Sequence, residues 1–287
     1  MKKLSAILII LAAFVNLYAF EWPQENTDKE AFESYFAQER GNRISTSVIF
    51  KEPEEIKTAE DGKILIVLTA LNDESDFFPS ALGTTVIMEH KDDLISVYGN
   101  LESESLETEE LTGKTVASGT KIARTGNTGW QKDISALEFQ IIDTKKSSAI
   151  NPKILMPRTD KEIELNLTGI TIQDKNGEFY DLNVYKNFSS GLYRVFQKKN
   201  SVAAPLKTTV SVNGTEVDKI SYDTISQYEE KVSVTGKHKY TSSEIYPTTK
   251  LHLVGEAVFT PGKVMLGITE TDVSGTVKTI TYNINIR

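Results

Sequence analysis

The chain has 287 residues, 25% of them charged and 39% hydrophobic, with a formal net charge of −8 and no cysteine. This length and composition suggest about two ordinary globular domains. The lack of cysteine excludes disulfides, thiolate metal sites, a cysteine nucleophile and an N-terminal lipid anchor. The negative charge argues against nucleic acid as a partner, because phosphate binding needs clustered Lys and Arg.

The first residues have the pattern of a secretory signal peptide. Lys2 and Lys3 precede an apolar run from Leu4 to Val15, and Ala19 is a small residue suited to cleavage. A membrane anchor is the alternative, but this run is shorter than the roughly 20 residues that cross a bilayer. We therefore expect residues 1–20 to be a signal peptide and the exported chain to lie in the periplasm or cell envelope, without a membrane span.

The next segment, residues 21–43, predicts one short helix. Thr27 followed by Glu30 resembles a capping box. One apolar helix face would follow, made of Phe32, Tyr35 and Phe36.

Short strand patterns separated by polar turns extend from Ile44 to Pro157. The expected strands are Ser47–Phe50, Lys63–Leu71, Thr84–Glu89, Leu94–Tyr98, Lys121–Thr125 and Leu137–Ile142. Strands this close together predict an all-β barrel or sandwich. The acidic stretch Glu102–Glu110 is expected to be a solvated loop, and prolines between Asn151 and Asp160 predict a linker.

A second β region begins near Ile163. Its expected strands are Leu165–Gln173, Tyr180–Tyr185, Gly191–Phe196, Thr208–Val212, Leu251–Thr260, Lys263–Asp272 and a last strand ending at Arg287. The final two form a hairpin through Val273-Ser274-Gly275. Seven or more strands are typical of an immunoglobulin-like sandwich. We thus expect one domain at 21–158 and an immunoglobulin-like β-sandwich domain at 159–287.

Several short motifs of the first region recur in one known order. They are Glu21-Trp22-Pro23, Phe36 to Arg40, Ala59 to Gly62, Val86 to His90, Tyr98 to Leu101, Gly113 to Val116, Gly119 to Ala123, Thr125 to Gly129, Leu137 to Ile141 and Asn151-Pro152. In this order and spacing the chain resembles the LytM/lysostaphin-type zinc metallopeptidases over residues 21–157. The resemblance implies the all-β duplicated hybrid motif, also called a barrel-sandwich, for this domain. The last hairpin similarly resembles bacterial immunoglobulin-like repeats.

The resemblance implies a zinc enzyme that cuts peptidoglycan cross-links, but the zinc ligands of the family are absent. A catalytic zinc needs three protein ligands and an open position for water. The three metal positions fall on Ser45, Ile49 and Glu138, and the two supporting histidines fall on Asn100 and Ala136. Isoleucine and alanine side chains have no donor atom for a metal. We therefore expect no zinc or other cofactor and no catalytic residue.

No other chemistry is indicated by the sequence. His90 matches a histidine of the family that is not a metal ligand, so a structural role is expected, and His238 and His252 share no ligand spacing and are expected on the surface or on a strand face. The segment Gly113–Gly119 lacks the order of a phosphate loop. No serine has a recognisable histidine partner, and acidic pairs such as Asp92-Asp93 are typical of solvated turns rather than of a glycosidase.

Three hypotheses of function remain open. The first is a binding or regulatory pseudoenzyme that docks peptidoglycan or a cell-wall hydrolase, as degenerate relatives activate amidases. Its expected cleft contacts are Tyr98, Asn100, Asn127, Trp130, Glu138 and Gln140. The second is an active zinc endopeptidase with a relocated site, and the third is a structural or adhesive envelope protein.

Overall fold

The structure is a computed structural model that describes residues 19–69, 80–107, 112–130, 135–159, 162–200 and 204–287. The signal-peptide prediction therefore lies outside the described residues, apart from Ala19 and Phe20. Within the described ranges, no helix combines the length and the apolar character that a membrane crossing requires.

The first unit, residues 19–159, is built from short strands. They are β1 Phe32–Ser34, β2 Glu39–Arg40, β3 Arg43–Ile44, β4 Val48–Phe50, β5 Glu55–Lys57, β6 Gly62–Leu68, β7 Thr84–Glu89, β8 Leu94–Leu101, β9 Thr115–Val116, β10 Lys121–Arg124, β11 Glu138–Asp143 and β12 Ser148–Ile150. Short 3-10 turns accompany them at Lys29–Ala31 (η1), Lys91–Asp93 (η2), Ser103–Ser105 (η3) and Pro152–Ile154 (η5). η3 belongs to the expected acidic loop, of which residues 108–110 lie outside the described residues.

The predicted helix in residues 21–43 is wrong. Only η1 forms there, and Thr27 does not cap it. Phe32 pairs with Phe50 across β1 and β4, while Tyr35 N–H donates to Gln38 Oε1 and Ala37 has a φ of +67°. The three aromatic side chains are buried as expected, but they are buried from a strand and a turn because strand pairing overrides the helical spacing.

The second unit, residues 162–287, consists of two packed sheets. Its elements are β13 Thr171–Gln173, β14 Phe179–Asp181, β15 Asn187–Phe188, β16 Gly191–Lys198, β17 Lys207–Val212, β18 Thr215–Tyr228, β19 Lys231–Thr235, β20 Lys239–Thr241, α1 Ser242–Ile245, β21 Leu251–Phe259, β22 Gly262–Thr271 and β23 Val277–Ile286. The predicted hairpin of β22 and β23 is confirmed, with Gly275 at a φ of +88° in its turn. The all-β fold class is confirmed, and the immunoglobulin-like assignment stays a prediction.

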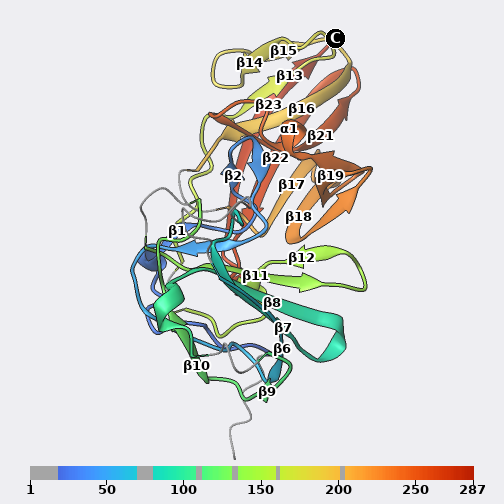
Figure 1. Cartoon of the computed structure of the whole chain (residues 1–287). Helices are drawn as coiled ribbons and strands as arrows, with labels where there is room; N and C mark the ends of the chain where they lie inside the picture. The colour runs from blue at the N-terminus through green and yellow to red at the C-terminus, as the bar shows by residue number, and fades with distance from the viewer. Residues whose placement is uncertain (1–18, 70–79, 108–111, 131–134, 160–161, 201–203) are drawn as a thin grey trace, which may run out of the picture.

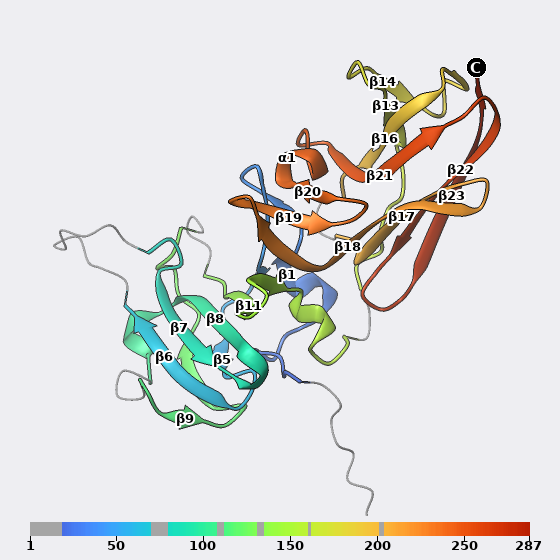
Figure 2. The same cartoon turned by 90° about the vertical axis from the view of Figure 1, so that its right-hand side faces the viewer.

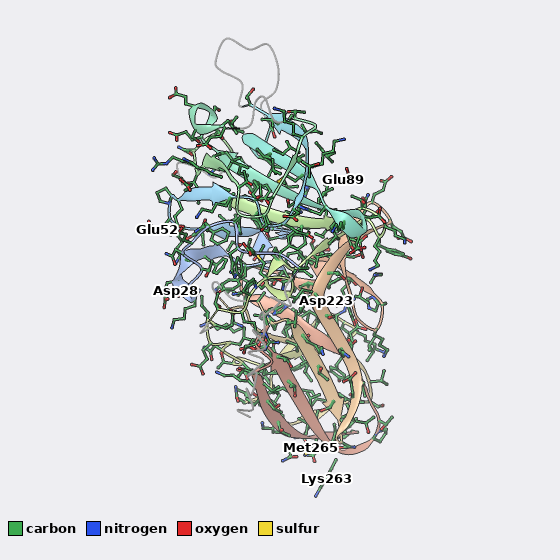
Figure 3. The ribbon with its side chains drawn as sticks, turned by 90° about the horizontal axis from the view of Figure 1, so that it is seen from below. Asp28, Glu52, Glu89, Asp223, Lys263 and Met265 are labelled. Atoms are coloured by element: carbon green, nitrogen blue, oxygen red, sulfur yellow. The ribbon has the colours of Figure 1, made fainter. Side chains whose placement is uncertain are left out.

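The two units share one sheet. The hydrogen-bonded path runs β15-β23-β22-β17-β18-β12-β11-β8-β7-β6-β9, and β12 pairs with β18 at the junction (Figures 1 and 2). Asp223, labelled in Figure 3, lies at this junction, where its carbonyl accepts from Asn151 N–H. The second sheet, β14-β13-β16-β21, covers the half of the path that belongs to the second unit.

The main hydrophobic core also extends across the junction. It joins buried residues of the first unit, such as Phe50 and Phe139, to Tyr222, Ile225 and Tyr246 of the second. A further core lies between the two sheets of the second unit. The expected boundary at residue 158 falls in a segment without strands. The folded units on either side of this boundary are nevertheless joined by a continuous sheet and core.

Candidate functional site

The three predicted metal positions lie together on the first unit. Ile49 of β4 is directly opposite Glu138 of β11 in the antiparallel register, which puts both side chains on one face. Ser45 Oγ donates to the Ser47 carbonyl at 3.0 Å, and Ser47 Oγ donates to Glu138 Oε1 at 2.7 Å. Ser45, Ile49 and Glu138 are thereby brought into one small region.

The two predicted supporting positions lie next to this region. Asn100 follows Gly99, which pairs with Glu138 across β8 and β11. Asn100 Nδ2 donates to the Ala136 carbonyl at 2.8 Å, and its Oδ1 accepts from the N–H groups of Thr128 and Gly129. The Asn100 side chain is fully buried, so it stabilises the loop before β11 and has no surface for a ligand.

Arg40 forms an ion pair with the acidic residue of this region. Its Nη1 is 2.8 Å from Glu138 Oε1, with 20% and 9% of the two side chains exposed. The guanidinium also stacks on the ring of Trp130, 4.0 Å from the ring centroid. Within the described ranges, the other N–H groups of Arg40 have no partner.

A cleft of about 420 Å³ opens beside this ion pair, and we call it the Arg40 cleft. Its lining consists of Arg40, Gly41, Arg43, Ile44, Ser45, Thr46, Ser47, Trp130 and Glu138. The tight hairpin of β2 and β3 positions the two arginines, and half of the Trp130 side chain is exposed. The cleft therefore offers a guanidinium, an aromatic ring and hydroxyl groups to a ligand.

The side chains at the zinc positions do not fit a zinc ion. Ile49 has no donor atom, the Ser45 hydroxyl donates to a carbonyl, and the carboxylate of Glu138 is bound to Arg40 and Ser47. A catalytic site requires three ligand atoms around one point. No group of three or more His, Cys, Asp or Glu side chains that could hold a metal occurs in the part of the chain that the structure describes.

The remaining expected cleft contacts are Tyr98, Asn127 and Gln140. Tyr98 is wrong as a ligand contact, because it is fully buried and its hydroxyl accepts from Ala59 N–H and Ser96. Asn127 is exposed but does not line the Arg40 cleft. Gln140 lies nearby, where its Nε2 donates to Thr46 Oγ1 at 2.6 Å.

The three histidines lie in different surroundings. His90 is buried between the Asp61 carbonyl and Ser96 Oγ, which is the arrangement expected of a structural residue. His238 is partly exposed, as expected. His252 lies on strand β21, one of the two expected alternatives, but its side chain is buried rather than at the surface and contacts Tyr222.

Arg40 and Ser47, which both bind Glu138, were not predicted as site residues from the sequence. Arg40 belongs to the motif Phe36 to Arg40, so the signal was present. Its partner is 98 residues away, and only the fold brings the two together.

Comparison with known proteins assigns the first unit. Residues 43–152 match the model of peptidase family M23, and this confirms the resemblance of this segment to the LytM/lysostaphin-type peptidases. A second family model matches residues 164–287. No curated protein matches the chain.

The solved structures that match part of the chain include the following three. The catalytic domain of the prophage-encoded M23 protein EnpA from Enterococcus faecalis, solved as a point mutant, is 18% identical, covers 42% of this chain and 86% of its own, and has a TM-score of 0.34. The complex of SpoIIIAH and SpoIIQ contains a chain that is 16% identical, covers 46% of this chain and 96% of its own, and has a TM-score of 0.37. A zinc-containing peptidase from Vibrio cholerae is 19% identical, covers 43% of this chain and 36% of its own, and has a TM-score of 0.34. This chain therefore spans about a third of that protein.

Proposed function

We propose, from the match of residues 43–152 to peptidase family M23 and from the geometry of the Arg40 cleft, that the chain is an exported, catalytically inactive peptidase homologue. Its role would be that of a binding or regulatory module of the cell envelope, with peptidoglycan or a cell-wall hydrolase as partner. The single observation that supports this most strongly is the Arg40–Glu138 ion pair, because a side-chain cation is bound to the one carboxylate at the former ligand positions.

The cleft has the chemistry of a peptide-binding site. Arg40 presents N–H donors that suit carbonyl and carboxylate oxygens. Trp130 presents an exposed ring of the kind that is enriched among residues that dominate binding energy. Ser45 and Thr46 add hydroxyl groups at the edge of strand β4. A ligand held here would be bound without a Lewis acid to polarise its peptide bonds.

Two measurements test the proposal. The purified chain is offered zinc and then assayed for bound metal and for cleavage of cross-linked muropeptides; we expect neither stoichiometric zinc nor turnover. Retention on purified sacculi and on immobilised envelope hydrolases is measured in parallel, and we expect binding to one of them.

A matched pair of variants localises the binding. Trp130→Ala should weaken retention by at least about tenfold, as truncation of a central aromatic residue does. Tyr185→Ala removes a similarly exposed aromatic ring from the second unit and should leave retention unchanged. Measurable turnover would refute the proposal, and so would retention on neither material.

A further inference from the structure

A second cleft lies at the junction of the two units, beside the Arg40 cleft. It has a volume of about 310 Å³ and is lined by Asn42 and Arg43 of the β2–β3 hairpin on one side and by Glu230, Lys231, Val232 and Thr241 to Ser243 of the second unit on the other. We call it the junction cleft. Arg43 lines both clefts, so the two adjoin at this side chain, and we call them together the groove.

The β2–β3 hairpin lines both clefts, and residues of the second unit bind it. Ile44 N–H donates to Ser242 Oγ at 3.1 Å, and Tyr246 O–H donates to the Ala37 carbonyl at 2.8 Å. Glu39 forms an ion pair with Lys199. The hairpin is therefore attached to the second unit at both of its strands, and the groove is a fixed feature of the fold rather than a gap between separately moving bodies.

Two cations face the junction cleft from opposite sides. Arg43 and Lys231 are exposed, and neither side chain has an ion pair or hydrogen bond among the described residues. Glu230 is the one acidic residue in the lining. Arg43 and Lys231 outnumber Glu230 in this lining, so the junction cleft is positively charged although the net charge of the chain is −8, and it favours an anionic group.

We propose that the junction cleft is a second subsite of the groove and that it takes a carboxylate of an extended peptide whose adjoining residues lie in the Arg40 cleft. The kind of ligand rests on the function proposed above. The subsite adds a specificity: a peptide with a free acidic group beyond the segment in the Arg40 cleft binds better than a neutral peptide of the same length, because a carboxylate pairs with Arg43 and Lys231.

The experiment uses the full chain and fluorescently labelled muropeptides released from purified sacculi, offered either untreated or with their carboxylates converted to amides. Arg43→Gln/Lys231→Gln should bind the untreated fraction about tenfold more weakly than the unmodified chain, as the loss of two charged contacts implies, and with a weaker dependence on salt. Both proteins should bind the amidated fraction equally. Lys219→Gln/Lys263→Gln makes the same change in net charge at exposed lysines away from the groove and serves as the control; Lys263 is at the far end of the second unit (Figure 3).

The outcomes separate this proposal from the preceding one. If the unmodified chain binds neither fraction, the peptide-binding function itself fails. If it binds and Arg43→Gln/Lys231→Gln binds the untreated fraction equally well at an unchanged melting temperature, only the second subsite is refuted. A third outcome is that inorganic phosphate displaces the labelled peptides as effectively as unlabelled untreated muropeptides do at the same concentration of negative charge. That result would show a general anion site and would also overturn the assignment to a peptide carboxylate.

Discussion

The Arg40 guanidinium and the Glu138 carboxylate are 2.8 Å apart and join the β2–β3 hairpin to strand β11. Both side chains are mostly buried, and Ser47 Oγ donates to the same carboxylate oxygen. A buried charge is tolerated when it is paired and hydrogen-bonded. The pair therefore stabilises the fold at one of the three predicted metal positions.

Arg40→Met should destabilise the chain by up to about 3 kcal/mol, because the buried side chain of Glu138 would lose its ion pair with Arg40. The free energy of unfolding in urea measures this effect. Glu138→Gln should cost less, since it removes the charge together with the ion pair. Glu30→Gln, which breaks the exposed pair with Lys29, should have no measurable effect; an equally small effect of Arg40→Met would contradict the structural role of the buried pair.

A zinc site should be restored by Ser45→His/Ile49→Asp/Glu138→His. The three positions are adjacent in the structure, and the last substitution also releases Arg40. We expect one zinc ion per chain by elemental analysis after dialysis, because three protein ligands are sufficient for a catalytic-type site. Glu138→His alone should retain none. If the triple variant folds and binds no zinc, the assignment of these residues to the ligand positions is wrong.

Asn100→Ala should cost about 3 kcal/mol of unfolding free energy, since it leaves buried backbone groups of Thr128, Gly129 and Ala136 without their partner. Asn42 provides the matched control, because both asparagines have a φ of 64°. Asn42→Ala should cost only about 1 kcal/mol, the cost of a left-handed conformation without glycine or asparagine. Equal losses for the two variants would show that the side-chain hydrogen bonds of Asn100 contribute nothing.

Most strands could be predicted from the sequence, and the exceptions have physical causes. β7 begins at Thr84 and ends at Glu89, as expected. β18 was missed although it is the longest strand described. Its inward position Asp218 is buried, where it accepts from Tyr240 O–H and Glu256 N–H, and a charged residue at a core position conceals the alternation.

The site could be predicted only in part. The structure brings Ser45, Ile49 and Glu138 together, and their assignment as metal positions stays a prediction. Motif spacing cannot reveal which distant side chain binds the Glu138 carboxylate, so the ion pair of Arg40 with Glu138 could not be predicted. The shared sheet was hidden for the same reason, because the pairing of β12 with β18 depends on tertiary contacts.

Stability should depend on pH through a buried pair of titratable groups in the second unit. Burial raises the pKa of Glu270 to about 7, and burial lowers the pKa of His252 to about 3. Gln197 lies between them and donates to both. The stability that neutral Glu270 contributes is fully present below the ordinary pKa of a glutamate and is lost as the pH rises to 7. The stability that neutral His252 contributes is fully present above the ordinary pKa of a histidine and is lost as the pH falls below that pKa.

Between about pH 4.5 and 6.5 the two effects oppose each other, so the melting temperature should change little there and should fall as the pH is lowered below about 4.5. Glu270→Gln should raise the stability progressively between about pH 4.5 and 7, by at most about 3 kcal/mol at pH 8, and should change it little at pH 4.5. Glu216→Gln, an exposed acid on β18, serves as the control. A difference in stability between Glu270→Gln and the unmodified chain that is the same at pH 4.5 and at pH 8 would show that Glu270 is not the titrating group.

The two units should unfold as one, because they share a sheet and a core. Trp22 reports on the first unit, where its ring packs against Phe32 and Phe50, and Trp130→Phe makes it the only tryptophan. In that background Ile225→Ala, on the second-unit strand β18 opposite Ala149, should lower the unfolding free energy reported by Trp22 by about 2 to 4 kcal/mol, the usual cost of such a truncation in a core. An unchanged Trp22 transition, together with a destabilised second unit by far-ultraviolet circular dichroism, would mean that β12 and β18 pair without coupling the units. It would also make residues 19–159 a separately folding body, in which case the junction cleft would lose the fixed wall on which the second subsite depends.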